Sequence, residues 1–137
     1  MGRTKKKILV IDDDEGHLVT TKELLEDAGY EVITHYNWFG STNAIKNLKP
    51  DLVLLDINMP ALPGDELSVI LRSNSKIKDV PIVFYSSNDE DSLRKAASEY
   101  GVRGYICKGD VCNMRRKIAV YLSQNQYEQF QANLTLA

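Results

Sequence analysis

The chain alternates between two patterns of apolar residues. Short apolar runs rich in β-branched residues recur, as in strands that are covered on both faces of a parallel sheet. They fall at residues 7–12, 31–35, 51–56, 80–86 and 105–107. Between them, apolar residues return every three or four positions, which is the spacing of one helix face. The predicted helices cover residues 16–30, 38–48, 65–72, 89–100 and a last segment from residue 111 onward.

Strands that alternate with helices predict a doubly wound α/β fold. Right-handed crossovers would give a five-stranded parallel sheet with helices on both faces. Gly29 suits the end of the first helix, Pro50 cannot continue the second, and Asp110 is a good N-cap for the last. The sequence contains no internal repeat. We therefore expect one α/β domain.

The length and composition limit the domain organisation. A chain of 137 residues suits one domain with its own core, and 43% hydrophobic with 26% charged residues is ordinary for globular proteins. We assign residues 1–5 to a basic leader, 6–123 to the domain and 124–137 to a polar tail. Three residues of the tail have the spacing of a helical extension: Tyr127, Phe130 and Leu134.

The charge and the cysteines narrow the partners and the compartment. A formal net charge of −2 gives no reason to expect a nucleic-acid or membrane partner. No segment approaches the roughly 20 apolar residues of a membrane span, and no cleavable leader is recognisable. Cys107 and Cys112 are too few for a disulfide framework or a metal quartet, so we interpret them as a buried strand residue and a helix residue. We expect a cytoplasmic protein.

Acidic residues follow two of the predicted strands. The stretch DLVLLDINMP places Asp56 at the end of a buried strand, and the first strand ends in Asp12, Asp13 and Asp14. Ligands of doubly wound sheets gather at the carboxyl ends of the strands. Carboxylates brought together there need a cation, and oxygen ligands suit Mg²⁺. We expect Asp14 and Glu15 to form a solvated helix start rather than to bind the ion.

Two further strand ends complete the candidate site. Ser86 and Ser87 end the fourth strand, and Lys108 follows the fifth. A metal, a lysine and a hydroxyl around one carboxylate are suited to phosphoryl transfer, with Asp56 as the nucleophile that becomes an acyl phosphate. No glycine-rich turn follows the first strand, which argues against a nucleotide or flavin phosphate there.

Over residues 6–123 the chain resembles the receiver domains of response regulators in two-component signalling, of the single-domain, chemotaxis-regulator type. The matching motifs are ILVIDDDE, LVLLDINMP, PIVFYSS and GYICK, in this order. The resemblance implies a flavodoxin-like sheet of strand order 2-1-3-4-5. It implies a phosphoacceptor and metal-binding set that we carry onto Asp12, Asp13, Asp56 and the backbone carbonyl of Asn58. It also implies a switch hydroxyl, a switch aromatic and a phosphate-binding lysine, carried onto Ser86, Tyr105 and Lys108.

The same resemblance implies a signalling mechanism. A histidine kinase or histidine phosphotransfer protein donates a phosphoryl group to Asp56 with Mg²⁺, Ser86 moves to hydrogen-bond it, and Tyr105 turns inward. The face formed by the fourth helix, fifth strand and fifth helix then changes its protein partner. No separate enzymatic activity is implied beyond self-catalysed phosphorylation and dephosphorylation, and no direct contact with nucleic acid. Asn58 and Asn88 are the positions expected to influence the lifetime of the phosphorylated state.

Departures from the family pattern keep alternatives open. The usual proline after the lysine, joined by a cis bond, is Gly109 here, so we predict a trans peptide. Ser87 stands where the family favours a smaller residue.

The chain is alternatively a pseudo-receiver that only binds a partner, or an aspartyl phosphatase of the haloacid-dehalogenase type. The latter would have a second acid where Asn58 stands. We interpret His17 and His35 as structural. Few residues follow the last helix, so we expect a stand-alone regulator or phosphate shuttle, unless the chain is cut from a longer protein.

Overall fold

The computed structural model describes residues 5–136, and their side chains as far as residue 123. Its five strands form one parallel sheet in the order β2-β1-β3-β4-β5. This is the predicted doubly wound topology, and the strand order is confirmed. The strands are β1 (Lys7–Asp12), β2 (Glu31–Tyr36), β3 (Leu52–Leu55), β4 (Ile82–Ser86) and β5 (Gly104–Cys107).

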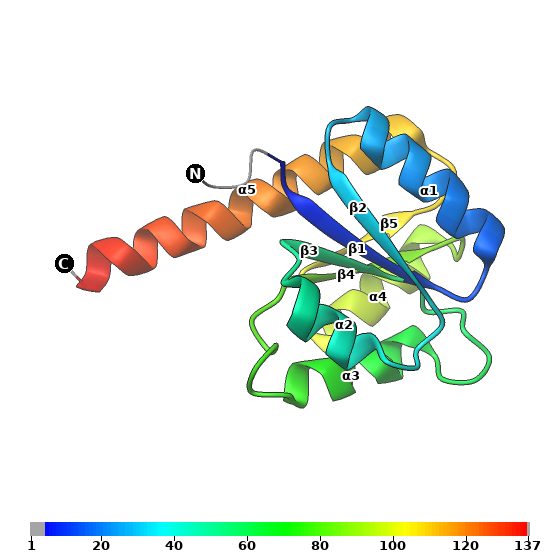
Figure 1. Ribbon diagram of the computed structural model, residues 1–137, viewed down its shortest axis with the longest axis horizontal. Coiled ribbons are helices and arrows are strands. Elements are labelled where there is room, and N and C mark those ends of the chain that lie inside the picture. The colour runs from blue at the N-terminus through cyan, green and yellow to red at the C-terminus, as the bar shows by residue number, and fades with distance from the viewer. Residues whose placement is uncertain (1–4, 137) are drawn as a thin grey trace.

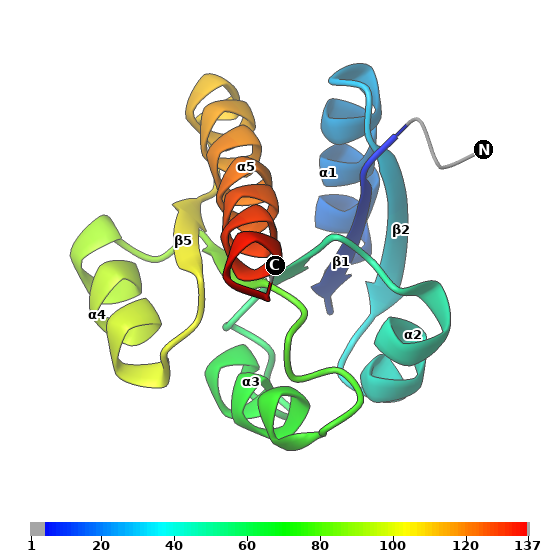
Figure 2. The ribbon, with the colours of Figure 1, turned by 90° about the vertical axis from the view of Figure 1, so that its left-hand side faces the viewer.

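Helices cover both faces of the sheet, as predicted. They are α1 (Glu15–Asp27), α2 (Ser41–Leu48), α3 (Gly64–Ser73), α4 (Glu90–Tyr100) and α5 (Val111–Leu136). Figure 2 shows α1 and α5 on one face of the sheet and α2, α3 and α4 on the other. Each connection between successive parallel strands contains one helix, which is the crossover that a parallel sheet requires.

The core consists of two apolar clusters, one on each face. Successive strand residues point to opposite faces, so Ile8 and Val10 of β1 join the cluster beneath α1 and α5, whereas Leu9 and Ile11 join the other. All four residues of β3 are fully buried and divide between the two clusters in the same way. The central strands are therefore fixed from both sides, together with whatever follows them at the carboxyl edge.

The helix predicted over residues 38–48 begins three residues later, at Ser41. Asn37 and Gly40 have positive φ angles of 56° and 78°, which helical residues do not adopt. The Asn37 side chain also accepts a hydrogen bond from the amide of Phe39 at 2.8 Å, which stabilises a turn in place of the first helical turn. The other strand and helix ends lie within three residues of the prediction.

The last helix, α5, spans 26 residues. Met114, Ile118 and Leu122 are buried against the sheet, and the helical backbone then continues without a break to Leu136. In Figure 1 this second half of α5 projects away from the α/β body. The boundary that we predict near residue 123 stays a prediction. None of the helices in residues 5–136 has the length and apolar character that a membrane crossing requires.

Candidate functional site

Three carboxylates lie together at the carboxyl edge of the sheet. Strands β1 and β3 are neighbours in parallel register, and the amide of Asp56 donates to the carbonyl of Ile11 at 3.0 Å. This pairing brings Asp56 beside Asp12, and the two residues are only 5% and 1% exposed. One carboxylate oxygen each of Asp12, Asp13 and Asp56 lies within 4.8 Å of the others. The convergence expected from the strand order is therefore present.

The environment of Asp56 opposes its ionisation. Burial is the main cause that raises the pKa of Asp56, to about 6, and the neighbouring charge of Asp12 acts in the same direction. A hydrogen bond from the amide of Asn58 at 3.0 Å and the positive charge of Lys108 oppose the increase. Because a pKa of about 6 lies below neutrality, the carboxylate is mainly ionised at pH 7 and can act as a nucleophile.

Lys108 supplies the positive charge of the cluster. Its Nζ atom lies 2.8 Å from Oδ2 of Asp12 and 3.6 Å from Oδ2 of Asp56. Its backbone amide donates to the carbonyl of Ser86 at 2.8 Å, which continues the pairing of β4 with β5. The described residues contain no cis peptide bond, so the prediction of a trans bond before Gly109 is confirmed.

Ser86 and two asparagines form a polar network beside Asp56. The Oγ atom of Ser86, at the buried end of β4, accepts hydrogen bonds from Nδ2 of Asn58 at 2.8 Å and from the amide of Asn88 at 3.2 Å. Asn58 also donates to Oδ1 of Asn88 at 2.9 Å. Because Asn58 also contacts Asp56 through its amide, the network connects the end of β3 to the end of β4.

Tyr105 is half-buried on the edge strand β5 and points its hydroxyl toward α4. The hydroxyl donates to Oε1 of Glu90 at 3.0 Å. The Nζ atom of Lys117 lies 3.8 Å from the centre of the Tyr105 ring and donates to its carbonyl oxygen. The Tyr121 hydroxyl contacts both the amide and the carbonyl of Tyr105, at 3.2 and 3.1 Å. Contacts with α4 and α5 thus define the position of this residue.

A close approach of two segments supports the end of β3. Gly64, the first residue of α3, is buried against the backbone of Asp56. A Cβ atom at this position would overlap the carbonyl group of Asp56 and lie 2.8 Å from Cα of Ile57. The contact requires glycine for reasons of space, since its φ is not positive. Sequence reasoning missed this role, which only the tertiary contact reveals.

The remaining candidates have structural positions. Asp14 is exposed and caps α1 by accepting from the amide of His17 at 3.0 Å, as expected of a solvated helix start. Ser87 is exposed just after β4. Cys112 is exposed on α5, and Cys107 is half-buried on β5 rather than buried, because β5 is an edge strand.

The two histidines differ in their contacts. The Nε2 atom of His35, in β2, contacts the carbonyl of Phe39 at 2.6 Å and belongs to the turn before α2. The Nδ1 atom of His17, in the first turn of α1, lies 3.0 Å from Nζ of Lys108. The contact between His17 and Lys108 joins residues 91 positions apart, so no local sequence pattern predicts it.

The donor set at this edge suits a hard divalent cation. Three carboxylates with oxygens this close repel one another, and a small ion that prefers oxygen ligands, such as Mg²⁺, would relieve the repulsion. Together with a lysine beside one buried aspartate, the cluster can stabilise the charge on a phosphoryl group. The fold and the cluster define the class of doubly wound α/β domains with an acidic site at the carboxyl edge of the sheet.

Comparison with known families identifies the member of this class. Residues 8–127 match the family model of the response regulator receiver domain, so the chain belongs to that family. Receiver domains are signalling modules of two-component systems, and the family generally uses Mg²⁺ at an acidic pocket. The resemblance predicted from the motifs is therefore confirmed, and the haloacid-dehalogenase-type phosphatase has no support.

Individual relatives are similar over most of the chain. The polar-differentiation response regulator DivK of Brucella anthropi is 27% identical in an alignment of 107 residues that covers 75% of this chain and 84% of DivK. The alkaline phosphatase synthesis transcriptional regulatory protein PhoP of Bacillus subtilis is 34% identical over 103 residues, which are 75% of this chain and 42% of PhoP. The chain thus spans most of DivK but less than half of PhoP.

Solved structures share the fold. A two-component response regulator from Clostridium difficile superimposes with a TM-score of 0.76 at 27% identity, over 87% of this chain and 97% of that one. The chemotaxis protein CheY4 of Vibrio cholerae gives a TM-score of 0.77 at 23% identity, over 86% and 99% of the two chains. The likeness to CheY4 supports the flavodoxin-like fold alone.

Proposed function

We propose that the chain is a phosphorylation-activated receiver that accepts a phosphoryl group on Asp56 from a histidine kinase or a histidine phosphotransfer protein. One observation carries the proposal. Two acidic side chains, Asp12 and Asp13, and the ammonium of Lys108 converge on the single carboxylate of Asp56 at the carboxyl edge of the sheet. This arrangement combines a nucleophile with groups that bind and neutralise a phosphoryl group.

The carboxylates provide the place for a metal ion. Asp12, Asp13 and Asp56 would hold Mg²⁺, with the backbone carbonyl of Asn58 as a further ligand. The bound ion supplies positive charge to the phosphoryl oxygens. Membership of the receiver family supports this assignment, as does the mutual repulsion that the three carboxylates would otherwise retain.

The transfer reaction needs few protein groups. A carboxylate oxygen of Asp56 attacks phosphorus, and the bond from phosphorus to the donor imidazole nitrogen breaks, with its electron pair going to that nitrogen. The product is an acyl phosphate. Lys108, already 3.6 Å from the accepting carboxylate, provides an N–H donor for a phosphoryl oxygen. The charge of the transferred group is thereby neutralised where it develops.

Ser86 and Tyr105 are the proposed switch residues. The Oγ atom of Ser86 serves as acceptor in both of its hydrogen bonds, so its hydroxyl proton is available to a phosphoryl oxygen on Asp56. Movement of Ser86 would make room for Tyr105 to turn inward and leave Glu90. The face made by α4, β5 and α5 would then change its affinity for a protein partner. We propose a cytoplasmic regulator that makes no direct contact with nucleic acid.

The first experiment measures the intact mass of the protein after incubation with acetyl phosphate and Mg²⁺. We expect one phosphoryl adduct that disappears in Asp56→Asn and when a chelator removes the metal. The asparagine variant is a close control because it keeps the shape of the side chain and removes only the nucleophilic charge. If wild-type protein forms no adduct and binds no beryllofluoride, the pseudo-receiver alternative replaces the proposal.

A further inference from the structure

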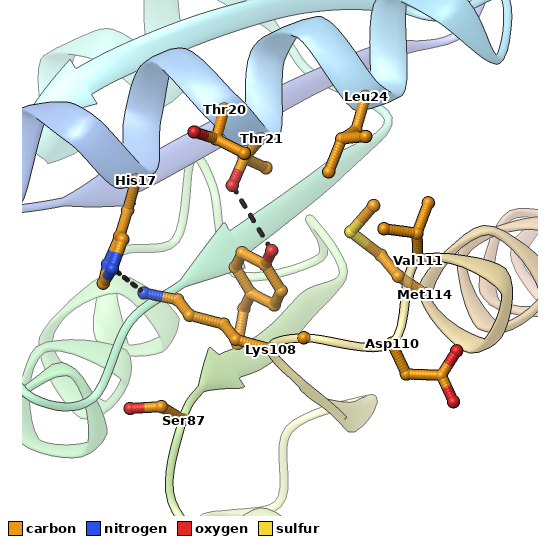
Figure 3. Close-up of a pocket in the computed structure, with 11 residues that line it drawn as sticks. His17, Thr20, Thr21, Leu24, Ser87, Lys108, Asp110, Val111 and Met114 are labelled. Atoms are coloured by element: carbon orange, nitrogen blue, oxygen red, sulfur yellow. Dashed lines mark hydrogen bonds between the residues drawn. The ribbon is translucent and has the colours of Figure 1, made fainter.

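The ammonium of Lys108 lies between three groups that come from three different elements. Nζ is 2.8 Å from Oδ2 of Asp12 at the end of β1, and 3.0 Å from Nδ1 of His17 in α1. It is 3.6 Å from Oδ2 of Asp56, directly after β3. Figure 3 shows His17 extending from α1 to meet the end of the Lys108 side chain. The Lys108 side chain is only 12% exposed.

The number of partners matches the number of donors. An ammonium group carries three N–H donors and accepts no hydrogen bond, so Nδ1 of His17 is the acceptor in its contact with Lys108. Asp12 and His17 hold two of the N–H groups, which leaves one N–H for the remaining neighbour, Asp56, whose Oδ2 lies 3.6 Å away. His17 differs from the other two partners because it is not one of the proposed metal ligands.

The loop after Lys108 is open at Gly109. Gly109 has a φ of 108°, and no atom lies within 4 Å of the position that a Cβ would take there, so the loop is not packed at this point. The rigid proline that the family usually carries at this position is absent. Support comes instead from the Tyr85 ring, whose centre is 5.2 Å from Nζ, and from His17.

The backbone of His17 is held in place by the residues before and after it. Its amide donates to Oδ1 of Asp14, the N-cap of α1, at 3.0 Å. The next residue, Leu18, is buried in the cluster beneath α1. The imidazole therefore extends from a fixed point of the helix, which allows one hydrogen bond to fix the position of Nζ.

We infer that His17 is a positioning residue for phosphoryl transfer, which holds the Lys108 ammonium so that one N–H faces the phosphoryl group on Asp56. This inference rests on the proposed function. In this chain the histidine takes over part of the support that a proline after the lysine would give. The residue acts through Lys108 and does not itself touch the reacting atoms.

The test compares three variants of the full chain. His17→Leu removes the acceptor, whereas His17→Asn keeps an acceptor oxygen near the position of Nδ1. Thr20→Leu is the matched control, because Thr20 is exposed on α1 and lines the same surface pocket as His17 and Lys108. With acetyl phosphate and Mg²⁺, we expect His17→Leu to lower the phosphorylation rate about tenfold, because a misplaced charge loses much of its effect on the transition state. We expect the other two variants to stay near the wild-type rate.

A second measurement does not depend on phosphorylation. The ¹⁵N resonance of the Lys108 ammonium, assigned by its loss in Lys108→Met, reports the hydrogen bonds of that group. We expect the same resonance in wild type and His17→Asn. In His17→Leu it should shift toward the resonances of exposed lysines and show faster proton exchange with water. A merely structural role for His17 would leave this resonance unchanged.

The outcomes separate the inference from the proposed function. A wild-type protein that forms no adduct and binds no beryllofluoride overturns the proposed function, and the role of His17 in transfer with it. Wild-type phosphorylation with an unchanged rate in His17→Leu overturns the inference alone. A rate in His17→Asn or Thr20→Leu as low as in His17→Leu also overturns it, since the effect would then not follow the hydrogen bond.

Discussion

The central strand β3 and the edge strand β5 place their functional residues by different means. β3 pairs on both sides, with β1 and β4, and every one of its four residues is buried. β5 pairs only with β4, and three of its four residues are partly exposed. Asp56 follows the first strand, and Tyr105 lies on the second.

The position of Asp56 therefore depends on the backbone, whereas the position of Tyr105 depends on side chains. Main-chain pairing and close backbone packing place Asp56, through the carbonyl of Ile11 and the contact with Gly64. Side chains of Tyr121, Lys117 and Glu90 place Tyr105. The first arrangement suits a nucleophile that must stay in place, whereas the second suits a residue that changes position.

The largest expected effect tests the backbone packing around Asp56. In Gly64→Ala, the new Cβ would overlap the carbonyl of Asp56, so either α3 or the end of β3 must move. We expect the free energy of unfolding to fall by about 3 kcal/mol, measured by urea denaturation. Gly29→Ala is the control, with a positive φ of 98° but no neighbouring atom within 4 Å, and should lose only about 1 kcal/mol. Equal losses would contradict the packing argument.

The second-largest expected effect is the pH dependence of stability that the carboxylate of Asp56 causes. The pKa of Asp56 is raised from 3.8 to about 6, so the folded state binds its proton more tightly than the unfolded state. The resulting stability is fully present below pH 3.8 and is lost as the pH rises through about 6. As the pH rises from about 4.5 to about 7.5 without divalent cations, the free energy of unfolding of the wild type should fall by about 2 kcal/mol relative to that of Asp56→Asn. Urea denaturation of both proteins at the two pH values measures this difference. If the stability of the two proteins changed in parallel with pH, the prediction would be refuted.

A smaller effect tests the side-chain support of β5. Tyr121→Phe removes the hydroxyl that contacts both the amide and the carbonyl of Tyr105, and we expect a loss of about 1.5 kcal/mol in the free energy of unfolding. Tyr100→Phe is the matched control, since the hydroxyl of Tyr100 makes no hydrogen bond to the side chains and backbone that the structure describes. Urea denaturation of both variants decides the point, and equal losses would show that β5 does not depend on this hydroxyl.

The smallest expected effect concerns the contact of Tyr105 with α4. Glu90→Ala removes an exposed acceptor, and exposed hydrogen bonds add little stability, so we expect a loss of about 0.5 kcal/mol or less by urea denaturation. The Tyr105 ring should nevertheless become more mobile, measured as averaging of its aromatic NMR signals. A loss as large as that of Tyr121→Phe would mean that Glu90 supports the fold of β5 and not only the orientation of the ring.

Sequence patterns predicted the architecture well because the central strands follow strong local rules. Short apolar runs such as Leu52–Leu55 are typical of strands in the interior of a parallel sheet. The predicted start of α2 at residue 38 was wrong, because a local turn at Asn37 and Gly40 replaces the first helical turn. Apolar spacing gives no information about such a turn.

The candidate site likewise contains contacts that the sequence predicts and contacts that it does not. The approach of Asp12 and Asp56 follows from strand order, which the alternation of elements already predicts. The contacts of Lys108 with His17 and of Gly64 with Asp56 depend on how loops meet after folding, and nothing in the neighbouring sequence signals them. The roles that we carry onto Ser86 and Tyr105 stay predictions, since they concern a phosphorylated state.

The projecting half of α5 has a hydrodynamic consequence. At a rise of 1.5 Å per residue, the 26 residues of this helix span about 39 Å, of which only the first part lies on the sheet. A compact chain of this length would have a radius of gyration of about 14 Å. A body with a protruding rod scatters X-rays with a larger radius, sediments more slowly than a sphere of equal mass, and tumbles faster about the rod than end over end.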